Sequence, residues 1–359
     1  MSQAFFAITP PGLEAVVARE LETLGHRGKP VQGGVDLNLP ITTGAPLACR
    51  LRTATRLLMR IGHGRVRSAD DLARLIRAQR WRDFLDPRSK VEVSVTSRGS
   101  RLRHREQIRK KTQLTIRDAL RRAPRSGRWP SQVQHLAVRI VDDVATLSLD
   151  AGGAPLHQRG WRKRTGAAPL RETFAAAMLV AAGYTGDEPL LDPFCGSGTL
   201  PIEAARLAGG QPPWTRRGFA WEEWPVLSKT RRPKVSAHKP AHPIVGSDRD
   251  PHAIDRAQSN AQRAKAPIQW SVREVARVVA PADGGLVVAN PPYGHRLEHG
   301  SDKAYRGLGQ ALAGPLTGWR AVFLAPDERQ ARLVSPRTRR VTAFPNGGLR
   351  VGVYTVDPL

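Results

Sequence analysis

Cysteine is scarce in this sequence, and its scarcity excludes two common structural devices. The 359 residues contain only Cys49 and Cys195, which lie far apart and form no Cys-x-x-Cys pair. A disulfide framework or a zinc site built on thiolates needs more cysteines at closer spacing. His238 and His242 are four residues apart, but Pro240 lies between them and no further ligand is near. We therefore expect no metal site.

Long apolar segments are also missing. No run approaches the roughly 20 residues that a membrane-spanning helix needs, and the N-terminus has no charged region followed by an apolar one. The sequence thus predicts neither membrane insertion nor secretion, and we expect a cytoplasmic protein. Its length allows two or three domains, each large enough for a core of its own. Nothing in the sequence predicts the oligomeric state.

Acidic residues are few relative to basic ones. The chain has 31 Asp and Glu against 57 Lys and Arg, a formal net charge of +26. Such an excess favours a polyanionic partner, although an arginine-rich genome can produce one without any partner. The distribution therefore matters more than the total. Residues 98–128 hold twelve Lys or Arg and only two acids, Glu106 and Asp118, so the charge is concentrated in one segment.

The segment Leu190 to Ala205 reads as a strand, a tight glycine turn and a helix. Gly196 and Gly198 permit the turn, and Thr199 is a candidate N-cap for the helix. The dinucleotide pattern Gly-x-Gly-x-x-Gly fails because Pro201 occupies its third glycine position. A glycine turn beside the strand-terminal carboxylate of Asp192 suits a ligand with an ammonium group better than one with phosphates. S-adenosylmethionine is such a ligand.

A second polar motif, Asn290-Pro291-Pro292-Tyr293, directly follows the apolar run 286–289. In an open α/β sheet, ligands bind outside the carboxyl ends of the strands, so two strand-end motifs of one sheet face the same crevice. Alone, the tetrapeptide could be a turn that merely ends a strand. In this order after a glycine turn, it predicts that cofactor and substrate meet between the two motifs.

The pattern of the whole chain predicts an α/β protein with several parts. Short alternating strands and amphipathic helices fill the first 150 residues, an α+β pattern. The later part alternates strands with helices, apart from a loop-like insertion at Gly209 to Ala241, and ends in a hairpin around Asn346-Gly347-Gly348. This predicts a doubly wound, Rossmann-like parallel sheet with an antiparallel terminal hairpin. The expected boundaries are 1–55, 56–150, a linker at 151–168, and 169–359.

Several segments beyond the two motifs resemble one enzyme family. They are Ala7 to Glu14, Arg52 to Arg56, Ser100 to His104, Leu156 to Arg162 and Ala168 to Thr173. Together with the glycine turn and Asn290-Pro291-Pro292-Tyr293, they resemble RlmL-like class I methyltransferases, in which ferredoxin-like and THUMP regions precede the catalytic domain. The resemblance implies methyl transfer from S-adenosylmethionine to the N2 amino group of a guanosine in 23S ribosomal RNA. Related THUMP enzymes act on tRNA.

The resemblance also implies roles for particular residues. THUMP regions bind RNA, which agrees with the basic segment. The expected RNA-binding residues are Arg98, Arg101, Arg103, Arg105, Arg109, Lys110, Lys111, Arg117, Arg121 and Arg122. The expected cofactor-binding residues are Asp192, Phe194, Cys195, Gly196, Gly198, Thr199, Asp248 and Glu274.

Two acids among the expected cofactor-binding residues, Asp248 and Glu274, follow later strands than Asp192 does. Asp248 ends the next strand, where an acid can accept hydrogen bonds from ribose hydroxyls, whereas the nearby Asp250 suits a helix cap before Pro251. The family usually has Asp near the adenine amino group. This chain has Glu274 closest to that position, and a solvated glutamate at a helix start is the alternative interpretation.

The catalytic set is Asn290, Pro291, Pro292 and Tyr293. The lone pair of an exocyclic amino group is delocalised into its ring, so the site must localise it. The Asn290 side-chain oxygen and the Pro291 carbonyl can accept both amino hydrogens and aim the lone pair at the methyl carbon. Tyr293 offers a face on which an extruded base can stack.

Other functions share parts of this pattern. DNA adenine or cytosine methyltransferases and protein glutamine methyltransferases use the same tetrapeptide, but the THUMP-like half of the chain argues against both. A catalytically silent RNA-binding assembly factor is a further alternative. The intact Asp192, Gly196, Gly198, Asp248 and Asn290 argue against it, and cofactor binding would discriminate between the two.

Overall fold

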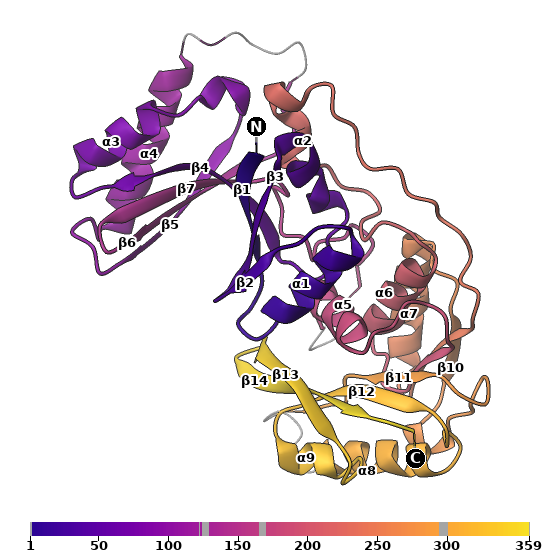
Figure 1. Cartoon of the computed structure of the whole chain (residues 1–359). Coiled ribbons are helices and arrows are strands. Elements are labelled where there is room, and N and C mark those ends of the chain that lie inside the picture. The colour runs from indigo at the N-terminus through magenta and orange to yellow at the C-terminus, as the bar shows by residue number, and fades with distance from the viewer. Residues whose placement is uncertain (1, 122, 124–128, 165–169, 294–300, 359) are drawn as a thin grey trace.

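The computed structural model describes residues 2–121, 123, 129–164, 170–293 and 301–358. Two seven-stranded sheets form two lobes. The first lobe, with β1 to β7, lies in the upper part of Figure 1, and the second, with β8 to β14, lies in the lower part. Arg122 and the expected boundary between Ala168 and Pro169 lie outside the described residues. None of the helices in the described part of the chain combines the length and the apolar character that a bilayer span requires.

The first sheet has the strand order β2-β3-β1-β4-β7-β6-β5 and is antiparallel except for β5 and β6. Its strands are β1 (Ser2–Ile8), β2 (Lys29–Val31), β3 (Gly34–Pro40), β4 (Arg56–Arg65), β5 (Val91–Arg98), β6 (Gln134–Val141) and β7 (Val144–Asp150). The long central strand β4 pairs with β1 on one side and β7 on the other. It therefore joins the expected regions 1–55 and 56–150 into one sheet, and the boundary between them stays a prediction.

The helices of the first lobe are α1 (Glu14–Thr23), α2 (Ile41–Gly44), η1 (Ala45–Cys49), α3 (Ala69–Arg77), η2 (Trp81–Asp83) and α4 (Arg105–Leu120). Helix α3 begins with a capping box, in which the side chains of Ser68 and Asp71 each accept a hydrogen bond from the other's backbone N–H. The 3-10 turn η1 ends at Cys49, and soon after it the N–H groups of Arg52 and Thr53 donate to the Glu20 carboxylate instead of to helix carbonyls.

The second sheet has the order β10-β9-β8-β11-β12-β14-β13. Its strands are β8 (Leu190–Asp192), β9 (Ile244–Asp248), β10 (Gln269–Val272), β11 (Leu286–Ala289), β12 (Arg320–Ala325), β13 (Arg339–Asn346) and β14 (Leu349–Val356). The first five are parallel and the last two form an antiparallel hairpin. The expected Rossmann-like sheet with a terminal hairpin is thus confirmed.

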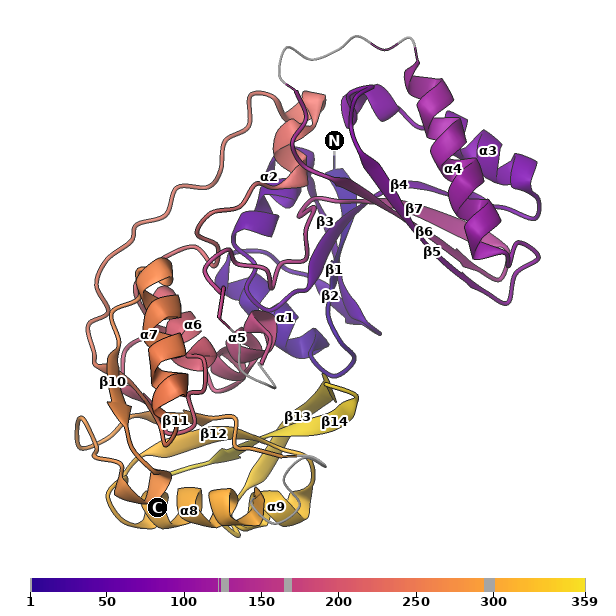
Figure 2. The ribbon, with the colours of Figure 1, turned by 180° about the vertical axis from the view of Figure 1, so that it is seen from behind.

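Helices cover both faces of this sheet (Figures 1 and 2). They are α5 (Glu172–Ala181), α6 (Thr199–Ala208), α7 (Pro251–Ala264), η5 (Val275–Arg277), α8 (Ser301–Ala313) and α9 (Glu328–Arg332). One core packs α5, α6 and α7 against the sheet, and a second packs α8 and α9 against the other face. The core beneath α5, α6 and α7 is rich in alanine, which lets these helices approach the sheet closely.

The two lobes exchange segments. Helix α1 of the first lobe places Val17 and Leu21 in its own core, but Leu13 and Val16 in the core of the second sheet. In the opposite direction, the insertion Gly209 to Ala241 is irregular apart from the 3-10 turns η3 (Ala220–Glu223) and η4 (Pro225–Leu227). The loop-like prediction is confirmed. The insertion nevertheless buries four side chains in the core of the first lobe, those of Phe219, Trp221, Trp224 and Leu227.

Candidate functional site

The carboxyl ends of β9, β8 and β11 lie side by side in the second sheet. Strand β8 is central, with β9 paired to one side and β11 to the other, all parallel. The chain leaves β8 toward β9 and later returns to β11, so the strand order reverses at β8. Such a switch point opens a crevice at the carboxyl edge. Asp192, Asp248 and Asn290 stand at or directly after these three strand ends.

Asp192 is a buried carboxylate without a counter-ion. Its side chain is 1% exposed, and its Oδ1 accepts a hydrogen bond from the Phe194 N–H at 2.9 Å. Burial raises the pKa of Asp192 well above its usual range, and the negative charge of Asp248 raises it further. In the described part of the chain, no Lys, Arg or His nitrogen lies within 4.0 Å of either carboxylate. The site therefore favours a cationic ligand.

The glycine turn is fixed to the end of β9. The Gly196 N–H donates to Asp248 Oδ2 at 3.0 Å, and the Cys195 N–H donates to the Ser247 carbonyl at 3.0 Å. Gly198 has a φ of +85°, and a Cβ there would lie 2.9 Å from the Trp270 ring and 3.1 Å from Ala257 Cβ. Only glycine fits this position.

Two predictions about this turn change in detail. Thr199 is not the N-cap of α6, because the left-handed Gly198 occupies that position and Thr199 is already helical. The Thr199 hydroxyl instead accepts a hydrogen bond from Arg162 Nη2 at 2.6 Å. Asp248 binds two backbone N–H groups, those of Gly196 and Asp250. Its expected ribose contact would use the remaining acceptor capacity of the carboxylate, and that contact stays a prediction.

Phe194 and Cys195 lie in the glycine turn, and their expected contact with the cofactor stays a prediction. The Phe194 ring is partly buried against the core beneath α8. The Cys195 side chain is buried, and burial together with Asp192 and Asp248 raises the pKa of its thiol well above the usual range. Because a thiolate is the reactive form, Cys195 is not set up as a nucleophile.

Asn290 presents a polar atom without a partner. Its Oδ1 is buried and accepts no hydrogen bond from any described residue. A buried amide oxygen left in this state costs free energy unless a ligand supplies a donor. Tyr293, three residues later, is held by the terminal hairpin, since Asn346 Nδ2 donates to the Tyr293 hydroxyl at 2.7 Å. Pro291 is buried and Pro292 partly buried between them.

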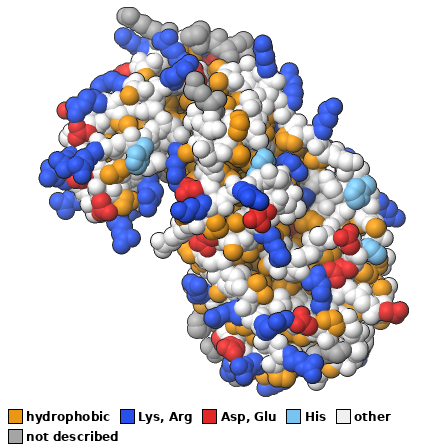
Figure 3. Space-filling model, in the orientation of Figure 1, with side chains coloured by type: hydrophobic (Ala, Val, Ile, Leu, Met, Phe, Trp, Pro, Cys, Tyr) orange, Lys and Arg blue, Asp and Glu red, His pale blue; other side chains and the backbone are white. Residues whose placement is uncertain are grey.

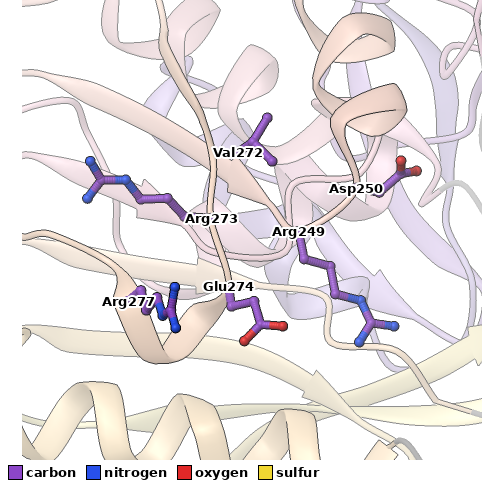
Figure 4. Close-up of a pocket in the computed structure, with 6 residues that line it drawn as sticks. All are labelled: Arg249, Asp250, Val272, Arg273, Glu274 and Arg277. Carbon is purple, nitrogen blue, oxygen red and sulfur yellow. The ribbon is translucent and has the colours of Figure 1, made fainter.

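Glu274 lies farther along the same edge of the sheet, in a hollow of about 800 Å³ (Figure 4). Its exposed side chain and that of Arg249 extend into the same region, and Asp250, Val272, Arg273 and Arg277 line the rest. The hollow does not include Asp192 or Asn290. Asp250 has the predicted capping role, because its carboxylate accepts from the His252 N–H at the start of α7. The adenine role of Glu274 stays a prediction.

Sequence reasoning missed three residues that organise this site. Asn346 was interpreted only as part of a turn. Asn260 of α7 is fully buried and donates to the Ser197 carbonyl at 3.0 Å and to the Arg164 carbonyl at 2.9 Å. It therefore holds the chain at Arg164, which lies between the two lobes in sequence, against the glycine turn. Arg162 bonds Thr199 from that same segment. A signal existed only for Arg162, which lies in the family-like segment 156–162.

The expected RNA-binding residues that the structure describes lie on β5, on α4 and in the chain next to them, and Lys and Arg side chains gather over this part of the first lobe (Figure 3). Arg109 pairs with Glu106, Lys111 with Asp70 and Arg101 with Asp143. The others that the structure describes have no acidic group within 4.0 Å among the described residues and are exposed: Arg98, Arg103, Arg105, Lys110, Arg117 and Arg121. We call these six the basic face.

The residues present fit S-adenosylmethionine as a cofactor. This molecule carries an ammonium group and a sulfonium, and the two uncompensated carboxylates of Asp192 and Asp248 supply the opposite charge. Nothing lies within 4 Å of the position that a Cβ of Gly196 would take, so the turn leaves open space beside its backbone. In the described part of the chain, no group of three or more His, Cys, Asp and Glu side chains is arranged to hold a metal ion.

Comparisons with known proteins agree with this geometry. Residues 159–350 match the family model described as RMKL-like, methyltransferase domain, and residues 4–58 match the RlmL ferredoxin-like domain. A relative in Bacillus subtilis (strain 168), named "Putative RNA methyltransferase YpsC", is 30% identical over 97% of this chain and 94% of its own length.

Solved structures show the same fold over the whole chain. A protein described as "SMU.472, a putative methyltransferase complexed with SAH" has a TM-score of 0.84 and 26% identity, covering 100% of this chain and 98% of its own. A Listeria monocytogenes protein, described as a predicted N6-adenine-specific DNA methylase, has a TM-score of 0.85 and 28% identity over 100% and 97%. The chain belongs to the RMKL-like methyltransferase family, and S-adenosylmethionine is its cofactor.

Proposed function

We propose that this methyltransferase modifies the exocyclic N2 amino group of a guanosine in RNA, with 23S ribosomal RNA as the first substrate to test. The observation that carries the proposal is the buried, unpartnered Asn290 Oδ1 at the end of β11, next to the anionic end of β8. An acceptor placed there suits an amino group. The match to the RlmL ferredoxin-like domain and the basic face support RNA as the substrate.

The chain's own groups then position the nucleophile. Bound S-adenosylmethionine supplies an electrophilic methyl carbon. Asn290 Oδ1 and the Pro291 carbonyl accept the two amino hydrogens and direct the nitrogen lone pair toward that carbon. The Tyr293 ring, anchored through its hydroxyl by Asn346, provides a fixed stacking face for the extruded base. No strong base is required, since the amino proton leaves to solvent after transfer.

Methyl transfer onto unmodified ribosomal RNA and tRNA, tested in parallel with labelled cofactor, measures this directly. Nucleoside analysis of the products is expected to yield N2-methylguanosine from 23S ribosomal RNA. Label in tRNA alone would move the substrate to tRNA. Methyl recovered on adenine N6 would overturn the guanosine assignment and favour the activity described for the Listeria protein. Failure to bind the cofactor would instead favour a catalytically silent RNA-binding factor.

We expect Asp192→Asn to weaken cofactor binding. The substitution keeps the shape of the side chain but removes the charge that faces the ammonium group, a charged hydrogen bond worth ~1.5–3 kcal/mol. This corresponds to a roughly 10- to 150-fold higher Kd by calorimetry. Asp187→Asn is the matched control, because Asp187 is exposed at the opposite end of β8. Equal affinities of the two variants would contradict the assignment.

The same carboxylate makes cofactor affinity pH-dependent. Burial raises the pKa of Asp192 in the free protein, and only the ionised form attracts a cation. Affinity should therefore rise with pH through this pKa and level off above it, with a proton released on binding. Asp192→Asn should flatten this profile, which calorimetry in buffers of different ionisation enthalpy can check.

The basic face should supply much of the RNA affinity through phosphate contacts. Replacing Arg103, Lys110 and Arg117 with glutamine removes three exposed charges that lack acidic partners in the described chain. Each lost phosphate contact lowers the slope of log affinity against log salt by about 0.7–0.9. We expect the triple variant to lower it by about two to three, with cofactor affinity unchanged. A parental salt slope measured by fluorescence anisotropy would place the RNA elsewhere.

A further inference from the structure

A second hollow, of about 720 Å³, lies where the two lobes meet. We call it the junction pocket. Its walls come from the connecting segment 154–162, the start of α5, the insertion at 216–218 and Gln132 of the first lobe. Five arginines line it against one carboxylate, that of Glu172: Arg159, Arg162, Arg171, Arg216 and Arg217.

Three of these arginines are committed to the fold. Arg159 pairs with Glu203, and Arg162 pairs with Glu172 at 3.1 Å. Arg217 donates to the backbone carbonyls of Gly152 and Pro155, at the start of the chain that connects the lobes. Arg171 and Arg216 are exposed, and neither has an acidic group within 4.0 Å in the described part of the chain. Two positive charges at the pocket thus have no acidic partner among the described residues, although the Arg171 guanidinium lies over the Phe174 ring.

The backbone that carries Arg216 is held in place. The Thr215 N–H donates to the Arg159 carbonyl at 2.8 Å, which docks the insertion on the connecting segment. Gly160 permits this contact, since a Cβ there would lie 2.9 Å from the Arg216 carbonyl oxygen and its φ is +89°. Gly218 likewise lies against the Gln132 side chain. The position of the pocket wall is therefore set before any ligand binds.

His157 places a buried imidazole at the same pocket. Its Nδ1 is buried and has no hydrogen-bond partner among the described residues. Burial, followed by the charges of Arg171, Arg159, Arg162 and Arg56, lowers the pKa of His157 to about 4. An anion in the pocket would offset the arginine charges and provide an acceptor for the imidazole N–H.

We propose that the junction pocket binds a backbone phosphate of the substrate RNA, through Arg171 and Arg216. A phosphate oxyanion can accept bidentate hydrogen bonds from arginine guanidinium groups, and the one carboxylate of the pocket, Glu172, is already paired with Arg162. The pocket is also linked to the cofactor turn, because Arg162 bonds both the Leu170 carbonyl and the Thr199 hydroxyl. The proposal rests on the proposed function, since it presupposes an RNA substrate. It adds a third RNA contact, besides those that we propose for the basic face and for the reacting nucleotide.

The test compares Arg171→Ala/Arg216→Ala with Arg27→Ala/Arg337→Ala in the full-length protein. Both pairs remove two exposed arginines, but the second pair does not line the pocket. Binding of a fluorescein-labelled, 20-nucleotide single-stranded RNA is measured over a salt series. We expect the pocket pair to bind about 10-fold more weakly, with the salt slope reduced by about 0.7, as for one lost phosphate contact. Equal loss in both pairs would overturn the proposal.

A second measurement follows the His157 imidazole by NMR in the parental protein. RNA binding should raise its pKa, and the pocket pair should abolish the RNA-induced rise. A rise with millimolar inorganic phosphate but none with RNA would identify a free-phosphate site and overturn the assignment to RNA. Neither experiment needs methyl transfer. If the parental protein methylates RNA but the pocket pair keeps the parental salt slope, only the phosphate site is refuted. If the parental protein does not methylate RNA, only the proposed function is refuted.

Discussion

Asn290→Ala is expected to lower the kcat of methyl transfer by about 10²-fold or more, with RNA affinity nearly unchanged. Asn290 Oδ1 is the buried acceptor without a partner at the end of β11. In the proposed mechanism, its hydrogen bond to the amino group would strengthen as the nitrogen gains positive charge in the transition state, so its loss should affect the rate more than binding. Removal of one preorganised transition-state contact typically costs this much. Single-turnover methylation with saturating cofactor is the measurement.

Two Tyr293 variants serve as controls for Asn290. Tyr293→Phe keeps the ring and loses only the hydrogen bond from Asn346, so we expect a mild effect. Tyr293→Ala removes the stacking face and should cost ~1–3 kcal/mol, with both KM and kcat affected. An Asn290→Ala enzyme that transfers methyl at nearly the parental rate would refute the positioning role.

Glu203→Ala should destabilise the folded protein by about 3–5 kcal/mol. Glu203 of α6 is fully buried, its Oε1 lies 3.3 Å from Arg159 Nε, and its Oε2 lies 3.8 Å from Arg52 Nη1. Arg159 also donates to the carbonyls of Leu51 and Arg52 in the first lobe. Removing the carboxylate would leave two guanidinium groups in the interior without a counter-charge. Urea unfolding followed by tryptophan fluorescence measures the loss.

An exposed ion pair on the same chain provides the matched control. Glu328 and Arg332 form a pair in α9 in which both side chains are more than 60% exposed. Glu328→Ala should cost less than about 0.5 kcal/mol. Replacing Glu203 and Arg159 together with Leu and Met should recover part of the stability, because the fully buried guanidinium is then gone and only Arg52, whose side chain is 13% exposed, has lost its contact with Glu203. If Glu203→Ala and Glu328→Ala unfold at the same urea concentration, the buried network does not hold the lobes together.

Local patterns predicted the parts of the site that depend on neighbours in sequence. The strand, glycine turn and helix around Asp192 and the tetrapeptide at Asn290 are each confirmed as structure, because apolar runs and glycines act within a few residues. The cap predicted at Thr199 is wrong because the left-handed Gly198 occupies that position, where a Cβ would lie too close to Trp270 and Ala257. Those two neighbours are more than fifty residues away and invisible to a local pattern.

Contacts across the fold could not be predicted in this way. The hydrogen bond from Asn346 to Tyr293 and those from Asn260 to Ser197 and Arg164 join residues that are 53, 63 and 96 positions apart. A polar residue in a turn or on a helix face gives no sign of such a partner. The burial of Trp221 and Trp224 in the core of the first lobe was equally hidden, since the surrounding insertion has the composition of a loop.

The exchange of segments between the lobes also bears on how the chain folds during synthesis. The first lobe ends its last strand at Asp150, but its core is completed only by residues up to Leu227. At about 5–20 residues per second, these 77 residues take roughly 4–15 s to translate. During that interval the emerging lobe exposes the apolar surface that Phe219, Trp221 and Trp224 later cover. Nascent chains of this protein therefore offer a chaperone a defined binding window, which closes when the insertion leaves the ribosome.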